Sequence, residues 1–141
     1  MLAGLQLNPR QNELTTKEET GMGKQVVRFS LDFVINEGKL AEFEKLARTM
    51  TAGSQKEEGT VGYEWCFRKD GKECRLLESY VDAYAVLAHL SGPVVQELVP
   101  KIQELANIRR FEVYGDPGPK ATEMLKEIGA EIFEHRIGLH C

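Results

Sequence analysis

The sequence predicts an α+β domain with a ferredoxin-like β-α-β-β-α-β order and an antiparallel sheet. Three observations carry this prediction. Four segments have apolar residues at every second position, two intervening segments repeat them at helical spacing, and an Asp-Gly pair joins the second and third strands. Right-handed crossovers place both helices on one face of such a sheet. A further helix and strand, from about residue 116 onward, extend the domain at its C-terminus.

Length and composition favour one globular domain. The 141 residues are 42% hydrophobic and 28% charged, with a net charge of −4 at pH 7. This acidic balance argues against a nucleic-acid partner, and the sequence has no run of 18 apolar residues that could span a membrane. Three cysteines without close spacing predict neither a disulfide framework nor a metal site, which is typical of a cytoplasmic protein. Residues 1–24 are polar and unpatterned, so we expect an N-terminal arm or tail ahead of a domain at 25–141.

The first strand and helix are predicted between residues 26 and 53. Apolar side chains fall at every second position from Val27 to Ile35, which is typical of a strand with one buried face. Asn36 is a suitable N-cap for the following helix, and Gly53 marks its expected end. The apolar face of that helix carries Leu40, Phe43, Leu46, Ala47 and Met50.

The later elements repeat the pattern. They are strands at 59–68 and 73–81, a helix at 83–90, a helical stretch at 94–105, a strand at 109–114, a helix ending at Gly129 and a last strand at 132–139. Asp82 is suited to cap the helix at 83–90. Gly92-Pro93 interrupts the helical region, and Pro100 is expected to kink or split the stretch after it. The last strand is expected to join its own sheet or that of a partner.

The turn Asp70-Gly71 fixes the register of the second and third strands. With these two residues as the loop, Arg68 lies opposite Glu73 in a surface ion pair, and Tyr63 lies opposite Glu78. Because side chains alternate, one face of the hairpin then carries Val61, Tyr63, Trp65, Phe67, Cys74, Leu76, Glu78 and Tyr80. We expect the helices to cover this face, so the Glu78 carboxylate requires a tyrosine partner or a raised pKa. Cys66 and Cys74 fall on opposite faces and should not form a disulfide.

The other face of the sheet is expected to combine apolar and charged side chains. Its predicted members are Val26, Arg28, Asp32, Val34, Glu64, Arg75, Ile108 and Tyr114. A partly apolar face of this kind is costly to leave in water, so we expect a second copy of the sheet to cover it, with Arg28 and Asp32 as ion-pair partners there.

The segment 78–90 carries a recognisable pattern. Its sequence is Glu-Ser-Tyr-Val-Asp-Ala-Tyr-Ala-Val-Leu-Ala-His-Leu, with acidic, aromatic and acidic residues followed by Ala-x-x-x-His. Together with the segments 37–39 and 59–64 and the Asp70-Gly71 turn, it resembles the antibiotic biosynthesis monooxygenase family, which includes quinol monooxygenase-like proteins. The resemblance covers roughly residues 25–115.

This resemblance implies a dimeric α/β barrel, in which two ferredoxin-like sheets face each other, and a pocket in each chain between sheet and helices. Several members oxidise polycyclic aromatic or quinol substrates with dioxygen, without metal or organic cofactor, and others degrade haem. His89 matches the histidine of the family pattern, whereas Pro93 stands where many members have a second histidine. A haem role is disfavoured because Leu98 and Val99 occupy the region of the haem-binding histidine.

The site expected from these observations has His89 and Glu78 as catalytic residues. Tyr63, Trp65, Phe67, Tyr80 and Tyr84 are the expected substrate-binding residues, with no metal and no cofactor. Three functions fit these residues: a cofactor-independent monooxygenase acting on a small phenol-like or quinol-like aromatic, a non-catalytic small-molecule-binding or stress-response protein, and an isomerase-type proton-transfer enzyme. A core role for the aromatic residues and a helix-capping role for His89 are the structural alternatives.

Overall fold

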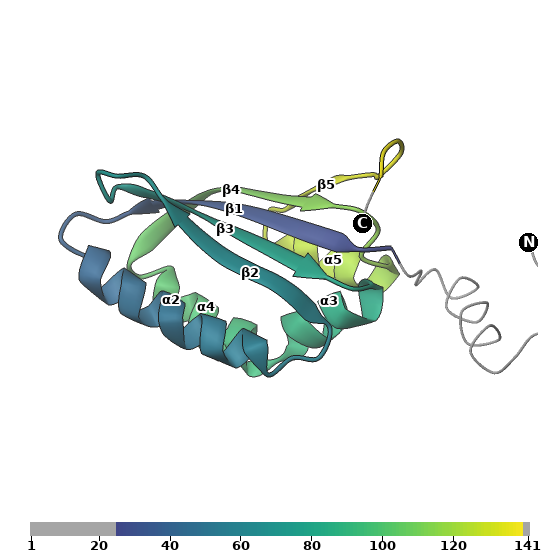
Figure 1. The fold of residues 1–141 in the computed structure, drawn as a ribbon, viewed down its shortest axis with the longest axis horizontal. Helices are drawn as coiled ribbons and strands as arrows, with labels where there is room; N and C mark the ends of the chain where they lie inside the picture. The colour runs from purple at the N-terminus through teal and green to yellow at the C-terminus, as the bar shows by residue number, and fades with distance from the viewer. Residues whose placement is uncertain (1–24, 140–141) are drawn as a thin grey trace, which may run out of the picture.

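A computed structural model describes residues 25–139 of the chain (Figure 1). The N-terminal arm expected at 1–24 therefore lies outside the described residues. The elements are β1 (Val27–Ile35), α2 (Leu40–Gln55), β2 (Thr60–Phe67), β3 (Glu73–Tyr80), α3 (Ala83–Ser91), the π-helix η1 (Val94–Leu98), α4 (Val99–Ile102), β4 (Ala106–Tyr114), α5 (Pro119–Glu127) and β5 (Glu131–Phe133).

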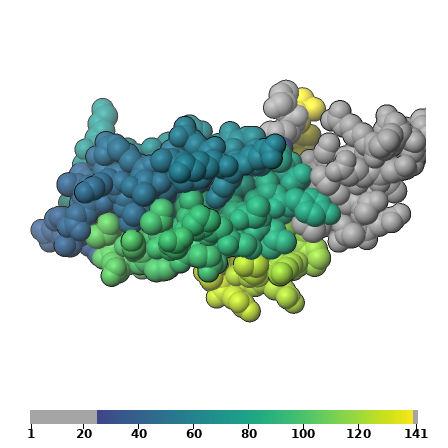
Figure 2. Space-filling view, turned by 90° about the horizontal axis from the view of Figure 1, so that it is seen from below, coloured from purple at the N-terminus to yellow at the C-terminus, as the bar shows by residue number. Residues whose placement is uncertain are grey.

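The strands form one open sheet in the order β2-β3-β1-β4-β5. The first three pairings are antiparallel, and β4 pairs with β5 in parallel. All helices lie on one face of the sheet (Figure 1), and Figure 2 shows α2 beside the helical residues 83–102 on that face. This arrangement confirms the predicted ferredoxin-like fold.

The C-terminal extension is shorter than predicted. Its strand β5 has three residues and pairs with β4 of the same chain, with Glu112 opposite Glu131. Ile137 and Leu139, which we expected in the strand, are 91% and 95% exposed. The described chain after Phe133 forms no further strand, so the parallel pairing of β5 with β4 is limited to three residues.

Helix α2 begins later than predicted. Its N-cap is Lys39, because Gly38 has a φ of +79° and forms a turn that delays the helix. The Asn36 side chain instead donates a hydrogen bond to the carbonyl of Glu104, 3.2 Å away, and so ties the end of β1 to the loop before β4.

The helical region after β3 is divided as predicted. Asp82 caps α3 by accepting a hydrogen bond from the backbone N–H of Ala85 at 2.9 Å. The α3 helix ends at Ser91, η1 follows, and Pro100 lies in the first turn of α4, where a missing N–H costs little. Leu105 falls beyond the end of α4, so the second stretch is shorter than expected.

The predicted hairpin register holds over most of its length. Tyr63 is opposite Glu78, and Phe67 is opposite Cys74. The Arg68 N–H still donates to the carbonyl of Glu73 at 3.0 Å, but the Gly71 N–H donates to the carbonyl of Arg68, so the loop after Arg68 is wider than the two residues expected. At the other end a bulge pairs Thr60 with Tyr80. The prediction that Val61 is on the covered face is therefore wrong, and its side chain is 60% exposed.

A second bulge corrects the predicted open face. In β4, Arg110 pairs with Asp32 but Ile108 pairs with Phe33, which leaves Arg109 as the extra residue. Since directly opposite residues share a face, Ile108 lies with Phe33 on the helix-covered side and not on the open side. This displacement brings an apolar side chain to the cavity described below.

The core lies between the sheet and the helices. It is built from the inward residues of β1 and β3, with Phe43 and Met50 from α2 and Val86 and Leu90 from α3. The Phe43 ring packs edge-on against Phe33 and Trp65, at centroid distances of 5.4 and 5.6 Å. Within residues 25–139, no helix is long and apolar enough to cross a membrane.

Candidate functional site

A cavity of about 730 Å³ lies between the sheet and the helical residues 89–103. Its wall is mixed, with somewhat more apolar than polar surface. The apolar part includes Phe29, Leu31, Phe33, Met50, Leu76, Leu90, Val95, Val99, Ile102, Ile108 and Phe111. The extension after α5 contributes Ile128, Gly129 and Glu131. A largely apolar cavity with a few polar groups is the usual form of a small-molecule site.

His89 lies between two carboxylates in the wall of this cavity. Its Nδ1 is 2.7 Å from Glu57 Oε1, and its Nε2 is 3.4 Å from Glu78 Oε1. The side chains of His89 and Glu78 are 3% and 5% exposed, whereas that of Glu57 is 18% exposed. Both ring nitrogens therefore face an acidic oxygen, one deep in the core and one toward the surface.

Two tyrosines complete the polar end of the cavity. The Tyr80 hydroxyl donates a hydrogen bond to Glu78 Oε1. The Tyr80 and Tyr63 rings lie against the imidazole of His89, with centroid distances of 5.1 and 6.0 Å. Tyr80 has no exposed surface and lies behind Glu78, while Tyr63 lines the cavity.

Burial controls the protonation of these groups. Desolvation raises the pKa of Glu78, and the positive charge that His89 can carry and the Tyr80 hydrogen bond lower that pKa only in part. Desolvation, reinforced by the charge of Glu78, also raises the pKa of Tyr63 and of Tyr80 well above the usual value for tyrosine. Both phenols therefore stay neutral at physiological pH, and the Glu78 carboxyl keeps its proton to a higher pH than an exposed glutamate does.

Local structure explains why these side chains meet. The cap at Asp82 fixes the start of α3, and His89 follows two turns later on the buried side of the helix. Glu78 points inward because it alternates with Leu77 on β3. Glu57 follows the C-terminus of α2, where the Thr60 hydroxyl donates a 2.7 Å hydrogen bond to Glu57 Oε1 and holds the carboxylate against His89.

The other predicted binding residues lie elsewhere. Trp65 and Phe67 border a separate hollow of about 470 Å³ against α2, and Trp65 Nε1 donates a 2.9 Å hydrogen bond to Thr51. Tyr84 is 41% exposed on the outer side of α3 and is not among the residues that line either hollow. Of the seven predicted residues, the structure brings His89, Glu78 and Tyr63 together in the cavity wall, with Tyr80 directly behind them.

Sequence reasoning missed Glu57 and the cavity wall formed by η1 and α4. Glu57 lies in a Lys-Glu-Glu-Gly run that is typical of an exposed helix end, so nothing in the pattern distinguishes it from Glu58. The only usable signal is its place just before β2, whose inward face carries the expected site. In residues 25–139, no group of three or more His, Cys, Asp and Glu side chains is arranged to hold a metal ion.

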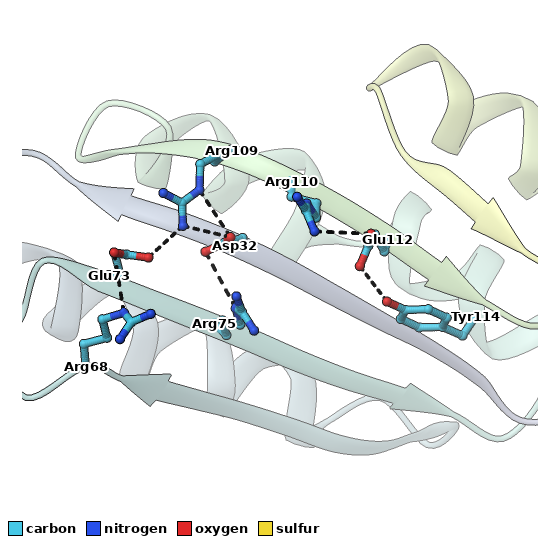
Figure 3. Close-up of polar contacts among 8 residues, drawn as sticks. All are labelled: Asp32, Arg68, Glu73, Arg75, Arg109, Arg110, Glu112 and Tyr114. Atoms are coloured by element: carbon cyan, nitrogen blue, oxygen red, sulfur yellow. Dashed lines mark hydrogen bonds and ion pairs between the residues drawn. The ribbon is translucent and has the colours of Figure 1, made fainter.

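The open face of the sheet carries a second charged cluster (Figure 3). Asp32 accepts a hydrogen bond from Arg109 Nη2 at 3.0 Å, and the same nitrogen is 2.7 Å from Glu73 Oε1. Arg75 pairs with Asp32 at 3.8 Å, and Arg68 pairs with Glu73 at 3.5 Å. The predicted Arg68–Glu73 pair is therefore confirmed. The exposed side chain of Leu77 lies two residues beyond Arg75 on the same face, and those of Tyr114 and Phe133 stack on each other at the other end of β4.

Solved structures with the same fold come from several bacteria. MupZ from Pseudomonas fluorescens is 26% identical, with a TM-score of 0.71 over 83% of this chain and 95% of MupZ. A conserved Bacteroides thetaiotaomicron protein of unknown function, described as a possible oxidoreductase, is 25% identical, with a TM-score of 0.60 over 64% of this chain and 97% of its own. SnoaB, a cofactor-independent oxygenase from Streptomyces nogalater, is 18% identical, with a TM-score of 0.58 over 64% of this chain and 92% of SnoaB. Among curated proteins, none matches the chain.

The sequence itself matches a family model. The antibiotic biosynthesis monooxygenase model covers residues 27–101, which run from β1 into α4 and therefore include Glu57, Glu78 and His89. The strands β4 and β5 and the helix α5 lie outside the matched region. The chain belongs to the antibiotic biosynthesis monooxygenase family.

Proposed function

We propose that this protein is a cofactor-independent monooxygenase that binds a small phenol-like or quinol-like aromatic in the cavity and removes a proton from it. The observation that carries the proposal is the pairing of His89 with Glu78 in the wall of a cavity that also carries many apolar side chains. The volume of about 730 Å³ accommodates a molecule of several rings. The presence of SnoaB, a cofactor-independent oxygenase, among proteins of this fold supports the proposal.

The charges around the cavity favour an uncharged substrate. Among the described lining residues the only arginines are Arg109 and Arg110, and their guanidinium groups pair with acidic side chains on the open face. Glu78 contributes an acidic group inside the cavity, with Glu57 just behind His89. A carboxylate or phosphate on the ligand would be repelled and left without a cationic partner, so neutral aromatic molecules fit better.

The proposed reaction divides the work between protein and substrate. His89 or Glu78 accepts the phenolic proton, which requires no change of oxidation state. The resulting electron-rich anion reduces dioxygen inside the apolar cavity, where water is excluded. For a substrate with a CH₂ group beside the ionised system, CH₂ and O₂ give C=O and H₂O. The carbon loses four electrons, and one oxygen atom enters the product while the other leaves as water.

We further propose that two copies associate through their open sheet faces. Leu77, Tyr114 and Phe133 are 42%, 38% and 45% exposed on that face. They share this face with the ion pairs around Asp32, and a mixture of exposed apolar and charged side chains suits a protein interface. Light scattering should give a particle of twice the chain mass of 15.9 kDa, and Leu77→Glu should reduce it to one chain. A monomeric wild type would contradict the association.

Oxygen uptake with a panel of anthrones and quinols tests the catalytic proposal. The wild type should consume oxygen with at least one member, and His89→Ala and Glu78→Gln should slow that uptake by about a hundredfold or more. His135, which lies on the C-terminal segment, supplies the matched control, because His135→Ala should leave the rate unchanged. Equal rates in the wild type and in both site variants would refute the assignment.

Proton transfer without oxidation is the second candidate, because a paired imidazole and carboxylate are sufficient for it. Turnover that continues without oxygen would favour this isomerase-type reaction. Ligand-induced thermal stabilisation without any turnover would instead favour a binding protein.

A further inference from the structure

The imidazole of His89 connects the cavity with the surface side of the domain. Its Nε2 faces Glu78, whose side chain is 5% exposed and lines the cavity. Its Nδ1 faces Glu57, which is 18% exposed and does not line the cavity. The two carboxylates therefore occupy opposite ends of a single ring, one at the proposed substrate and one closer to solvent.

Glu57 has an acceptor without a partner. Its Oε1 is engaged by His89 Nδ1 and by the Thr60 hydroxyl, but its Oε2 is buried and makes no hydrogen bond in the described residues. The Oε2 atom lies beside the backbone of Gly92, 3.7 Å from where a Cβ on that glycine would be. An unpaired buried carboxylate oxygen is costly, and a proton that arrives at Glu57 would remove its negative charge.

We propose that Glu57 is a positioning residue that holds His89 with its proton on Nδ1, and that Glu57 is the outlet of a proton relay from Glu78 through His89. This inference rests on the proposed function for the source of the proton, which enters at Glu78 from the bound substrate. The proton passes from Glu78 to Nε2, the Nδ1 proton moves to Glu57, and Glu57 releases it to water. No electrons move in these steps. The ring returns to its starting state when Glu57 takes a proton from water and passes it to Nδ1, and the Nε2 proton goes back through Glu78 to the reduced oxygen that leaves as water.

The groups that face His89 support this direction of transfer. Four titratable side chains of the described chain contact it: Glu57 after α2, Tyr63 on β2, and Glu78 and Tyr80 on β3. Burial raises the pKa of both tyrosines, so they remain neutral and do not compete for the proton. Among residues 25–139, the two carboxylates are the acceptors that face the two ring nitrogens, and Glu57 is the more exposed of them.

The tautomer of His89 tests the positioning role without any substrate. Nitrogen NMR on the ¹⁵N-labelled full chain distinguishes the Nδ1–H from the Nε2–H form of each of the three histidines. We expect the Nδ1–H form in the wild type and in Glu57→Gln, because the amide oxygen of glutamine still accepts from Nδ1. We expect loss of that preference in Glu57→Ala. The Nε2–H form in the wild type, or an unchanged tautomer in Glu57→Ala, would overturn the inference.

Steady-state kinetics test the relay. Glutamine cannot take up the proton, so Glu57→Gln should lower kcat by about a hundredfold with little change in KM. The matched control is Glu58→Gln, which alters the adjacent exposed glutamate and should behave as wild type. If Glu57→Gln and Glu58→Gln have the same kcat, the relay is wrong. If the wild type turns over no substrate, the proposed function fails, and the tautomer measurement still decides the role of Glu57.

Discussion

The two charged clusters of this molecule lie on opposite sides of one sheet and differ in the cation that each contains. On the open face, Asp32 and Glu73 share the guanidinium of Arg109 (Figure 3). Beside the cavity, Glu57 and Glu78 share the imidazole of His89. Arginine keeps its proton at any physiological pH, whereas histidine gains and loses one near pH 7.

The choice of arginine or histidine distinguishes a cluster that stabilises the structure from one that can transfer protons. Hydrogen bonds to Glu73 and Asp32 raise the pKa of Arg109 further, so this cluster has one fixed charge state. In the buried cluster, desolvation raises the pKa of Glu78, and its neighbour is an imidazole, a group that can gain or lose a proton. The kind of cation and the degree of burial, rather than the presence of acidic groups, therefore distinguish the candidate active site from the open-face cluster.

The largest expected effect is the loss of activity in Glu78→Gln, compared with a matched change at Glu73 on the opposite side of β3. Glu78→Gln should reduce substrate-dependent oxygen uptake by about a hundredfold or more, because the cavity loses a proton acceptor. Glu73→Gln, five residues earlier on the same strand, should leave the rate unchanged because its side chain lies on the open face. An equal loss of rate in the two variants, measured with an oxygen electrode, would remove the functional distinction between the faces.

The open-face cluster should matter for stability instead. Asp32 is 6% exposed and pairs with two arginines, so Asp32→Asn should lower the free energy of unfolding by about 1–3 kcal/mol. Arg68→Gln removes a more exposed ion pair and should cost less than about 1 kcal/mol. Urea denaturation at neutral pH measures both values. A larger loss for Arg68→Gln than for Asp32→Asn would contradict this ranking.

Much of the fold was accessible from the sequence because periodicity and capping are local signals. Alternation placed β1 to β4, Asp82 marked the start of α3, and the Asp70-Gly71 turn gave the register that puts Glu78 opposite Tyr63. These signals depend on residues close together in the chain, and the structure retains them.

Features that depend on distant contacts were not accessible. The bulges at Val61 and Arg109 change which face a side chain occupies. The residue types at these positions are ordinary for a strand, so the sequence pattern does not indicate a bulge at either one. Glu57 reaches His89 only because α2 and α3 pack on the same side of the sheet, a contact that spans 32 positions in the chain. The predicted binding role of Trp65 and Phe67 rested on their shared face, which α2 divides into two separate hollows.

Stability should respond to pH through Glu78. Its folded pKa is raised, so above the unfolded value of about 4.3 the unfolded state releases this proton more readily than the folded state. Each pKa unit of difference lowers the stability by about 1.4 kcal/mol as pH rises through that window. Glu78→Gln removes this titration. The melting temperature of the variant minus that of the wild type should therefore become more positive as the pH rises from 4 to 8. A constant difference would show that burial does not perturb this carboxyl.

The smallest expected effect concerns the two cysteines of the hairpin. Cys66 is exposed on the open face, whereas Cys74 is 1% exposed, and burial raises its pKa to about 12. In a variant that lacks Cys141, a thiol reagent at pH 8 should modify Cys66 and spare Cys74 until the protein is unfolded. Mass spectrometry of the peptides measures the ratio. Equal labelling of both thiols in the folded chain would contradict the assignment of opposite faces.

The ionisation of a bound phenol tests the central claim most directly. An aromatic phenol whose absorbance changes on ionisation is added without oxygen, at a pH below its own pKa in water. We predict the spectrum of the phenolate when it is bound to the wild type, and that of the neutral phenol when it is bound to Glu78→Gln or His89→Ala. A bound phenol that stays neutral in the wild type would contradict the proposal that Glu78 and His89 take a proton from the substrate.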